Sequence, residues 1–179
     1  MEQSKSNAPP SLVGEFHLIE MLTRAEASPP GCFVEVGVYK GGSAWRLQEL
    51  AQRQHRALFL YDTFEGIPHK AYCDSHSIGD FADADYVEVA RMFPLAVVVK
   101  GIFPGSAVHM PSVAFAHIDC DQYQSVLESA LYLQPRMVSE GVMWFDDSPL
   151  LAGARQAVHE LYANRVQLSS DHGKHYVVF

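Results

Sequence analysis

Apolar residues recur along this chain at two spacings, and each spacing predicts a kind of element. Residues 11–27 carry apolar side chains every three or four positions, which is typical of an amphipathic helix. Short, nearly continuous apolar runs such as 32–36 and 57–62 are instead typical of strands that are buried on both faces. The two kinds of segment alternate along the chain. We expect further helices at 41–54, where Ser43 suits an N-cap, and at 83–93, 122–134 and 152–164. We expect further strands at 95–101, 113–119, 141–147, 165–169 and 175–179.

Strands that alternate with helices of ten or more residues indicate βαβ units and a parallel sheet. We therefore predict an α/β fold: one doubly wound, Rossmann-like domain over residues 1–179, with a mostly parallel sheet of about seven strands and helices on both faces. Residues 63–82 are rich in Gly, Pro, Asp, Ser and His and show no period. A loop of that length in a compact domain predicts a lid over a binding site.

Charge and composition exclude several classes of protein. The 179-residue chain has a formal net charge of −8, which disfavours nucleic-acid binding because that binding depends on Lys and Arg. No apolar stretch approaches the length of a membrane span, and residues 1–10 lack signal-peptide features, so we expect a frayed start and no membrane association. Three cysteines without a CxxC pair predict reduced thiols in a cytoplasmic protein.

Acidic residues stand where the predicted strands end. Carboxylates there are costly unless something pairs with them, and in a doubly wound sheet ligands bind beyond the carboxyl ends of the strands. We therefore expect these acids to converge on one crevice. They are Asp62, Asp119, Asp121, Asp146 and Asp147.

The turn after the first strand reads E-x-G-x-x-x-G, with Glu35, Gly37 and Gly41, and does not fit the G-x-G-x-x-G of dinucleotide-binding folds. An acid at Glu35 suits an amine-bearing or cationic ligand, and S-adenosylmethionine is both. Asp62 is placed to accept hydrogen bonds from ribose hydroxyls. The plain alternative is a set of turn glycines beside a solvated Glu35.

Six motifs, "FVEVGVYKGGSA", "YDTFEGIP", "GDF", "KGIFPGS", "HIDCDQYQS" and "WFDDSP", occur in the order found in the macrocin O-methyltransferase family, which this chain resembles from Cys32 to about Pro149. The resemblance implies a class I, S-adenosylmethionine-dependent enzyme that methylates hydroxyl groups of sugar-bearing natural products. The "HIDCDQY" motif after the predicted fourth strand and the Asp pair after the fifth also resemble the metal-dependent catechol and caffeoyl-CoA O-methyltransferases.

The resemblance also implies roles for individual residues. It assigns the cofactor loop to Glu35, Gly37, Gly41 and Ser43, the ribose to Asp62, and the adenine to Phe64. It makes Asp119, Asp146 and Asp147 the ligands of a divalent cation, for which Mg²⁺ is the first choice. Asp119 is also expected beside the cofactor. The lysine that the catechol-type enzymes place shortly after the first of these acids is missing here.

The residues themselves support that assignment and leave alternatives open. Three carboxylates with no basic residue beside them suit a hard divalent cation with oxygen ligands. Asp119 can accept the proton of the substrate hydroxyl, and His117 is a second candidate. Other candidates, if the fold brings them near, are His69, His76, His172 and His175. A strand histidine is more often a hydrogen-bonded core residue, Asp121 suits a helix N-cap, and Asp146 and Asp147 also suit capping or a turn.

We therefore expect an S-adenosylmethionine-dependent, Mg²⁺-assisted O-methyltransferase whose acceptor is a hydroxyl of a small molecule, either sugar-bearing or phenol-like. Two alternatives remain: a non-catalytic module that binds the cofactor or a metal, and an NAD-dependent oxidoreductase. Few residues precede the first strand to cover the substrate, which favours a homo-oligomer whose partner chain supplies the cover.

Overall fold

A seven-stranded sheet organises the computed structural model, which describes residues 8–179. The strands are β1 (Cys32–Val36), β2 (Leu58–Asp62), β3 (Val97–Lys100), β4 (Val113–Ile118), β5 (Met137–Phe145), β6 (Gln167–Leu168) and β7 (His175–Val178). Their order in the sheet is β3-β2-β1-β4-β5-β7-β6. The first five strands run parallel, and β7 runs antiparallel to both β5 and β6. The predicted, mostly parallel sheet is thus confirmed.

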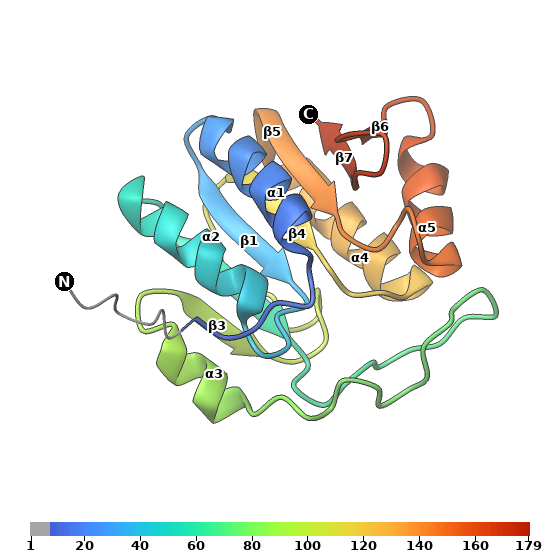
Figure 1. Cartoon of the computed structure of the whole chain (residues 1–179), viewed down its shortest axis with the longest axis horizontal. Helices are drawn as coiled ribbons and strands as arrows, with labels where there is room; N and C mark the ends of the chain where they lie inside the picture. The colour runs from blue at the N-terminus through green and yellow to red at the C-terminus, as the bar shows by residue number, and fades with distance from the viewer. Residues whose placement is uncertain (1–7) are drawn as a thin grey trace.

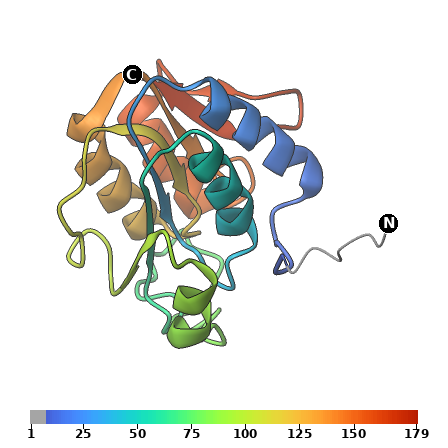
Figure 2. The same ribbon diagram turned by 90° about the vertical axis from the view of Figure 1, so that its left-hand side faces the viewer.

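Helices cover both faces of this sheet (Figures 1 and 2). They are α1 (Glu15–Ala27), α2 (Gly42–Arg53), α3 (Tyr86–Met92), α4 (Tyr123–Leu133) and α5 (Ala152–Tyr162), with a short 3₁₀ turn at Gln134–Arg136. Alternate side chains of the strands pack into two separate hydrophobic cores. Phe33 and Trp144 pack with α1 and α2, whereas Val34 and Met143 pack with α4 and α5. Burial on both faces explains why the strand sequences are almost continuously apolar.

The register of the parallel strands brings their carboxyl ends to one level. Val36 pairs with Tyr61 on one side and with Ile118 on the other, and Ile118 pairs with Phe145. The residues that follow these strand positions therefore emerge side by side at one edge of the sheet. The chain order reverses between β1 and β4, which is where ligands bind in doubly wound folds.

Two helix starts differ from the sequence prediction. Ser43 does not cap α2; Gly41 is the N-cap, with φ 87°, and Ser43 lies inside the helix. Asp121 does not cap α4, because it takes φ 59° and precedes the N-cap Gln122, whose side chain makes no capping bond. The cap is supplied from elsewhere: Asp74 Oδ1 accepts the backbone N–H of Tyr123 at 2.8 Å.

The long loop is longer than predicted: residues 63–85 form no helix or strand. Asp74 anchors it, because its second oxygen accepts the N–H of Ala71 at 2.6 Å within the loop itself. Gln122 adds two bonds by donating from Nε2 to the carbonyl oxygens of His69 and His76, both at 3.1 Å. The loop is therefore tied to the start of α4.

The N-terminal prediction is only partly testable, since residues 1–7 lie outside the described residues. Pro10 is not frayed, however. A Cβ added at Gly42 would lie 2.3 Å from Ser11 Cα and 2.6 Å from the Pro10 carbonyl oxygen, so this segment packs tightly on the start of α2. The three cysteines are free thiols, as predicted. Among the described helices, none is long and apolar enough to cross a membrane.

Replacing Asp74 by Ala should release the loop. We expect the free energy of unfolding to fall by about 1 kcal/mol, as for the loss of other helix caps, and tryptic cleavage after Lys70 to become faster. Limited proteolysis with a urea titration measures both effects. Asp85→Ala is the matched control, since Asp85 caps α3 through the N–H of Glu88 at 2.9 Å but does not anchor this loop. Equal cleavage rates in the two variants would contradict the anchoring role.

Candidate functional site

One cavity of about 340 Å³ lies at the carboxyl edge of the sheet. That size suits a small organic ligand. It joins the turn after β1, the end of β2, the long loop and the acids after β4 and β5. The lining residues are drawn from segments 10–13, 36–43, 61–68, 101–103, 119–121 and 146–150, together with Phe81, Ser125, Ser129 and Lys174.

Glu35 lies beneath the glycine turn rather than in solvent. It is fully buried; its Oε1 accepts the Ser43 hydroxyl at 2.5 Å and lies 3.1 Å from His117 Nδ1. Burial alone would lower the pKa of His117, but the hydrogen bond to Glu35 and the neighbouring carboxylates raise it overall. Glu35 and His117 do not line the cavity, whereas Ser43 does. Glu35 is therefore a buried residue that supports the glycine turn. It is not a solvated residue beside a set of turn glycines, as the alternative interpretation required.

Asp62 shapes the same turn from the end of β2. Its Oδ2 accepts the N–H groups of Val38 and Tyr39, both at 2.8 Å, and its Oδ1 accepts the N–H of Phe64 at 2.7 Å. The carboxylate lines the cavity, and a carboxylate has about four acceptor positions, so it can still accept a hydroxyl. Asp62 holds two loops in place and faces the ligand space.

Besides Glu35, two further predicted cofactor residues do not line the cavity. Phe64 is buried in the core, where its ring lies 5.3 Å from that of Tyr86. Gly41 faces the ring of Phe93 and serves as the helix N-cap. Both residues shape the turns around the cavity without contacting its interior.

Gly37 lets the glycine turn approach the acid after β4. It has φ 93°, and a Cβ at this position would lie 1.7 Å from the backbone carbonyl oxygen of Asp119. No side chain can be accommodated without separating the two turns. Gly37 therefore sets the contact between the two halves of the cavity.

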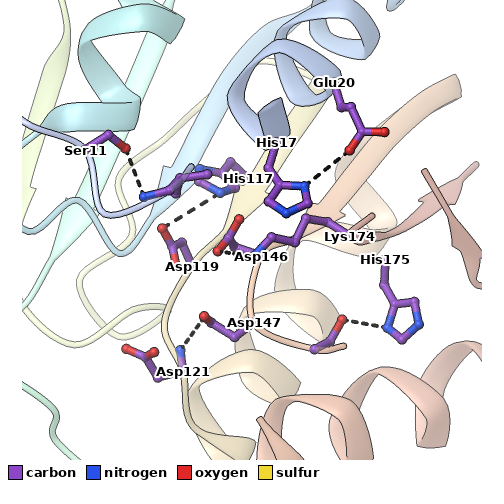
Figure 3. Close-up of polar contacts among 12 residues, drawn as sticks. Ser11, His17, Glu20, His117, Asp119, Asp121, Asp146, Asp147, Lys174 and His175 are labelled. Carbon is purple, nitrogen blue, oxygen red and sulfur yellow. Dashed lines mark hydrogen bonds and ion pairs between the residues drawn. The ribbon is translucent and has the colours of Figure 1, made fainter. Parts of the chain in front are cut away.

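The three predicted metal ligands do come together (Figure 3). Asp119, Asp146 and Asp147 each offer one oxygen atom, and these atoms lie within 4.8 Å of one another. Asp147 Oδ2 accepts the backbone N–H of Asp121 at 3.1 Å, and His117 Nε2 lies 3.9 Å from Asp119 Oδ2. Capping accounts for neither Asp146 nor Asp147 at the start of α5, whose N-cap is Leu151 with no side-chain bond.

Burial and mutual repulsion raise the pKa values of Asp119, Asp121 and Asp147. The pKa of Asp119 is held well above its usual value, first by burial and then by the charge of Asp147. The same two causes, with Asp121 as the nearest charge, raise the pKa of Asp147 to about 7, and burial with Asp146 raises that of Asp121 to about 6. The hard oxygen donors of such a carboxylate cluster fit a cation such as Mg²⁺.

A lysine that the sequence reading missed also lies in the cluster. Lys174 Nζ donates to Asp146 Oδ2 at 2.7 Å, and both residues are buried. The expectation that no basic residue stands beside the acids is therefore wrong. The antiparallel register pairs His175 of β7 with Phe145 of β5, so Lys174 comes level with Asp146. This neighbour is 28 residues away in the sequence, and only the pairing of the last strand reveals it.

The other candidate histidines lie outside the cavity lining. His175 Nδ1 bonds the Ser148 hydroxyl at 2.8 Å, and its ring packs edge-on against His159. His76 bridges Asp80 and Asp121 at 3.7 Å from each. These histidines support the surrounding loops, and none stands beside Asp119 as a second proton acceptor.

Replacing Gly37 by Ala should force the two turns apart. Overpacking together with a disfavoured backbone angle should cost about 3 kcal/mol of the free energy of unfolding. Gly14→Ala is the control, because Gly14 has φ −61° and its nearest neighbouring atom is 4.0 Å from an added Cβ. Urea denaturation of both variants measures the difference. Equal stability would show that the close approach is not a constraint.

Without a metal ion, stability should fall as pH rises from about 4 to about 7. In that window the folded protein keeps a proton on Asp147, whose pKa is about 7, while the unfolded chain has released it at its ordinary pKa of 3.8. The folded state binds more protons, so its advantage shrinks with rising pH. Thermal denaturation with a chelator measures this, and Asp147→Asn should flatten the profile, whereas Glu49→Gln on the surface should not. A profile that rises through this window would contradict the burial of the acids.

Known proteins resemble this chain in sequence and in fold. The family model described as Macrocin-O-methyltransferase (TylF) matches residues 17–172. A curated relative, the 8-demethyl-8-(2,3-dimethoxy-alpha-L-rhamnosyl)-tetracenomycin-C 4'-O-methyltransferase of Streptomyces olivaceus, is 26 % identical over 162 residues, covering 78 % of this chain. The chain spans 60 % of the length of that relative.

Two solved structures share the fold. The O-methyltransferase NovP superposes with a TM-score of 0.72 at 20 % identity, covering 91 % of this chain and 76 % of its own. The calicheamicin methyltransferase CalS11 also gives 0.72, at 18 % identity, covering 92 % and 77 %. The sheet order and the two helix layers are thus those of class I methyltransferases. The match over residues 17–172 extends across nearly all described elements, and this chain belongs to the macrocin O-methyltransferase family.

Proposed function

We propose that this chain transfers a methyl group from S-adenosylmethionine to a hydroxyl group of a small molecule, with the help of a divalent cation. One observation carries the proposal. A single cavity is bounded on one side by a glycine turn that buried Glu35 braces, and on the other by three carboxylates. Family membership supports the same reaction class.

The glycine turn and Asp62 form the side of the cavity that suits the cofactor. S-adenosylmethionine supplies an electrophilic methyl group on a sulfonium centre. Asp62 lines the cavity with acceptor positions to spare for ribose hydroxyls, and Gly37 brings backbone within reach of the ligand. Ser43, held by Glu35, lines the same side. These residues bind and orient the donor.

The acids after β4 and β5 form the side that suits the acceptor. Asp119, Asp146 and Asp147 would hold Mg²⁺ or a similar cation, which when bound makes a substrate hydroxyl more acidic. Asp119 is the proton acceptor in this proposal, because it lines the cavity and because burial raises its pKa, which makes the carboxylate a stronger base. His117 is fully buried behind Asp119 and supports that residue without touching the substrate.

The long loop excludes water from the reacting groups. Ile67, Pro68 and Phe81 line the cavity from this loop, and Leu12 and Leu150 add apolar surface at 75 % and 77 % exposure. Exclusion of water strengthens the electrostatic interactions inside. This mixture of apolar wall and acids suits an acceptor with both a hydroxyl-bearing ring and an apolar part. We propose a sugar-bearing natural product, the kind of acceptor named for the Streptomyces olivaceus relative.

A homo-oligomer remains a prediction. Leu12, Phe16 and Ile19 are more than half exposed and recur at helical spacing along the start of the chain. A stripe of this kind is suited to cover by another chain.

Ligand-induced stabilisation tests the proposal first. S-adenosylhomocysteine at about a hundred times its dissociation constant should add about 2.7 kcal/mol to the free energy of unfolding, with NADH as the negative control. Mg²⁺ should add a further shift that Asp146→Ala removes and Glu49→Gln keeps. A shift with NADH and none with S-adenosylhomocysteine would favour an oxidoreductase.

Methyl transfer tests the role of Asp119. Asp119→Asn should lower kcat at least about 100-fold, because the acceptor for the proton is lost. Binding of S-adenosylhomocysteine should persist, which separates chemistry from cofactor binding. Transfer of radiolabelled methyl groups to a panel of glycosylated and phenolic acceptors measures the rate. Binding without turnover in the unmodified protein, on every acceptor, would indicate the non-catalytic module instead.

A further inference from the structure

Lys174 is the only basic residue among the described residues that line the cavity. Its side chain is 7 % exposed, and its Nζ lies 2.7 Å from Asp146 Oδ2. Figure 3 shows the lysine side chain extended towards Asp146 from the side opposite Asp119. A cation therefore already occupies one side of a site whose donors suit a metal ion.

Contacts of the backbone around Lys174 fix the position of its side chain. Lys174 donates its backbone N–H to Ser169 Oγ at 3.0 Å, and the Ser169 hydroxyl in turn donates to Glu20 of α1 at 2.9 Å. Gly173 makes the turn possible, since a Cβ there would lie 2.1 Å from Ser169 Oγ. Lys174 immediately precedes β7, whose first residue, His175, pairs with Phe145 at the end of β5. The lysine does not reach in from a mobile surface loop.

The carboxylate of Asp146 has a hydrogen-bond partner at only one of its two oxygens. Asp146 is 6 % exposed, and its second oxygen, Oδ1, is buried with no hydrogen-bond partner within the described chain. An ordinary structural ion pair would have its remaining lone pairs satisfied, because burying a charge pair is costly otherwise. Here the free oxygen belongs to a residue that groups with Asp119 and Asp147. The pair is arranged for a further cation beside the lysine.

We propose that Lys174 is a resident counter-ion of the carboxylate cluster and competes electrostatically with a divalent cation for Asp146. This rests on the proposed function, in which the same carboxylates bind the cation. With the site empty, the ammonium group holds Asp146 and offsets part of the negative charge. With a divalent cation present, the two positive charges repel each other across Asp146. The chain therefore binds the cation more weakly than three carboxylates alone would, and it keeps the cluster assembled in its absence.

Calorimetric titration with Mg²⁺ alone tests this. Lys174→Met keeps the length of the side chain and removes the charge, so its Kd for Mg²⁺ should be about tenfold lower than that of the unmodified protein, or lower still. Without metal, the variant should have a lower Tm, and saturating Mg²⁺ should restore it. Lys100→Met, which removes an exposed lysine paired with Glu65, should change neither quantity. Lys174→Arg keeps the charge and should not bind Mg²⁺ more tightly, a test that stands even if Lys174→Met fails to fold.

The outcomes separate this inference from the proposed function. Unchanged or weaker Mg²⁺ binding by Lys174→Met, or tighter binding by Lys174→Arg, would overturn the competition while leaving the metal site intact. No Mg²⁺ binding by either the unmodified protein or Lys174→Met would overturn both the competition and the metal part of the proposed function. Binding of S-adenosylhomocysteine, measured in parallel, reports on the cofactor site independently of both.

Discussion

The contact between Gly37 and the backbone of Asp119 is the constraint on which the cavity depends. The turn after β1 and the turn after β4 meet there at the point where the sheet order reverses. Because the missing side chain lets the two backbones touch, the glycine turn and the acidic cluster share one cavity rather than forming two clefts. Glu35, through its buried bonds to Ser43 and His117, fixes the same junction from below.

Negative charge in a confined space is the second organising fact. The acids that follow β4 and β5 cannot all ionise freely, and the structure offsets their charge in three different ways. Raised pKa values keep protons on some of the acids. A backbone N–H group donates to Asp147, and the ammonium group of Lys174 donates to Asp146. Bound metal would be a fourth means. This surplus of acceptors distinguishes the cluster from a surface acidic patch, where water provides the compensation.

The sequence predicts those features that depend on local pattern. Apolar runs ending in acids locate the strands, and because parallel strands end at one level, Asp62, Asp119 and Asp146 had to converge. Features that depend on non-local docking could not be predicted. Lys174 is placed by an antiparallel register, and Asp74 reaches α4 from an aperiodic loop. Phe64 illustrates a different limit, since a motif fixes a backbone turn but not which way the ring points.

The tie between the long loop and α4 determines how the cavity can open. Asp74 and Gln122 fasten the middle of the loop to the first residues of a helix that starts only four residues after Asp119. The loop therefore cannot swing as a free flap about its two ends without uncovering the first N–H of α4. A ligand can therefore enter or leave the cavity only past the parts of the loop on either side of this anchor. The cavity wall formed by the loop and the start of α4 are thus held together, so the opening of the cavity has a fixed edge at this anchor.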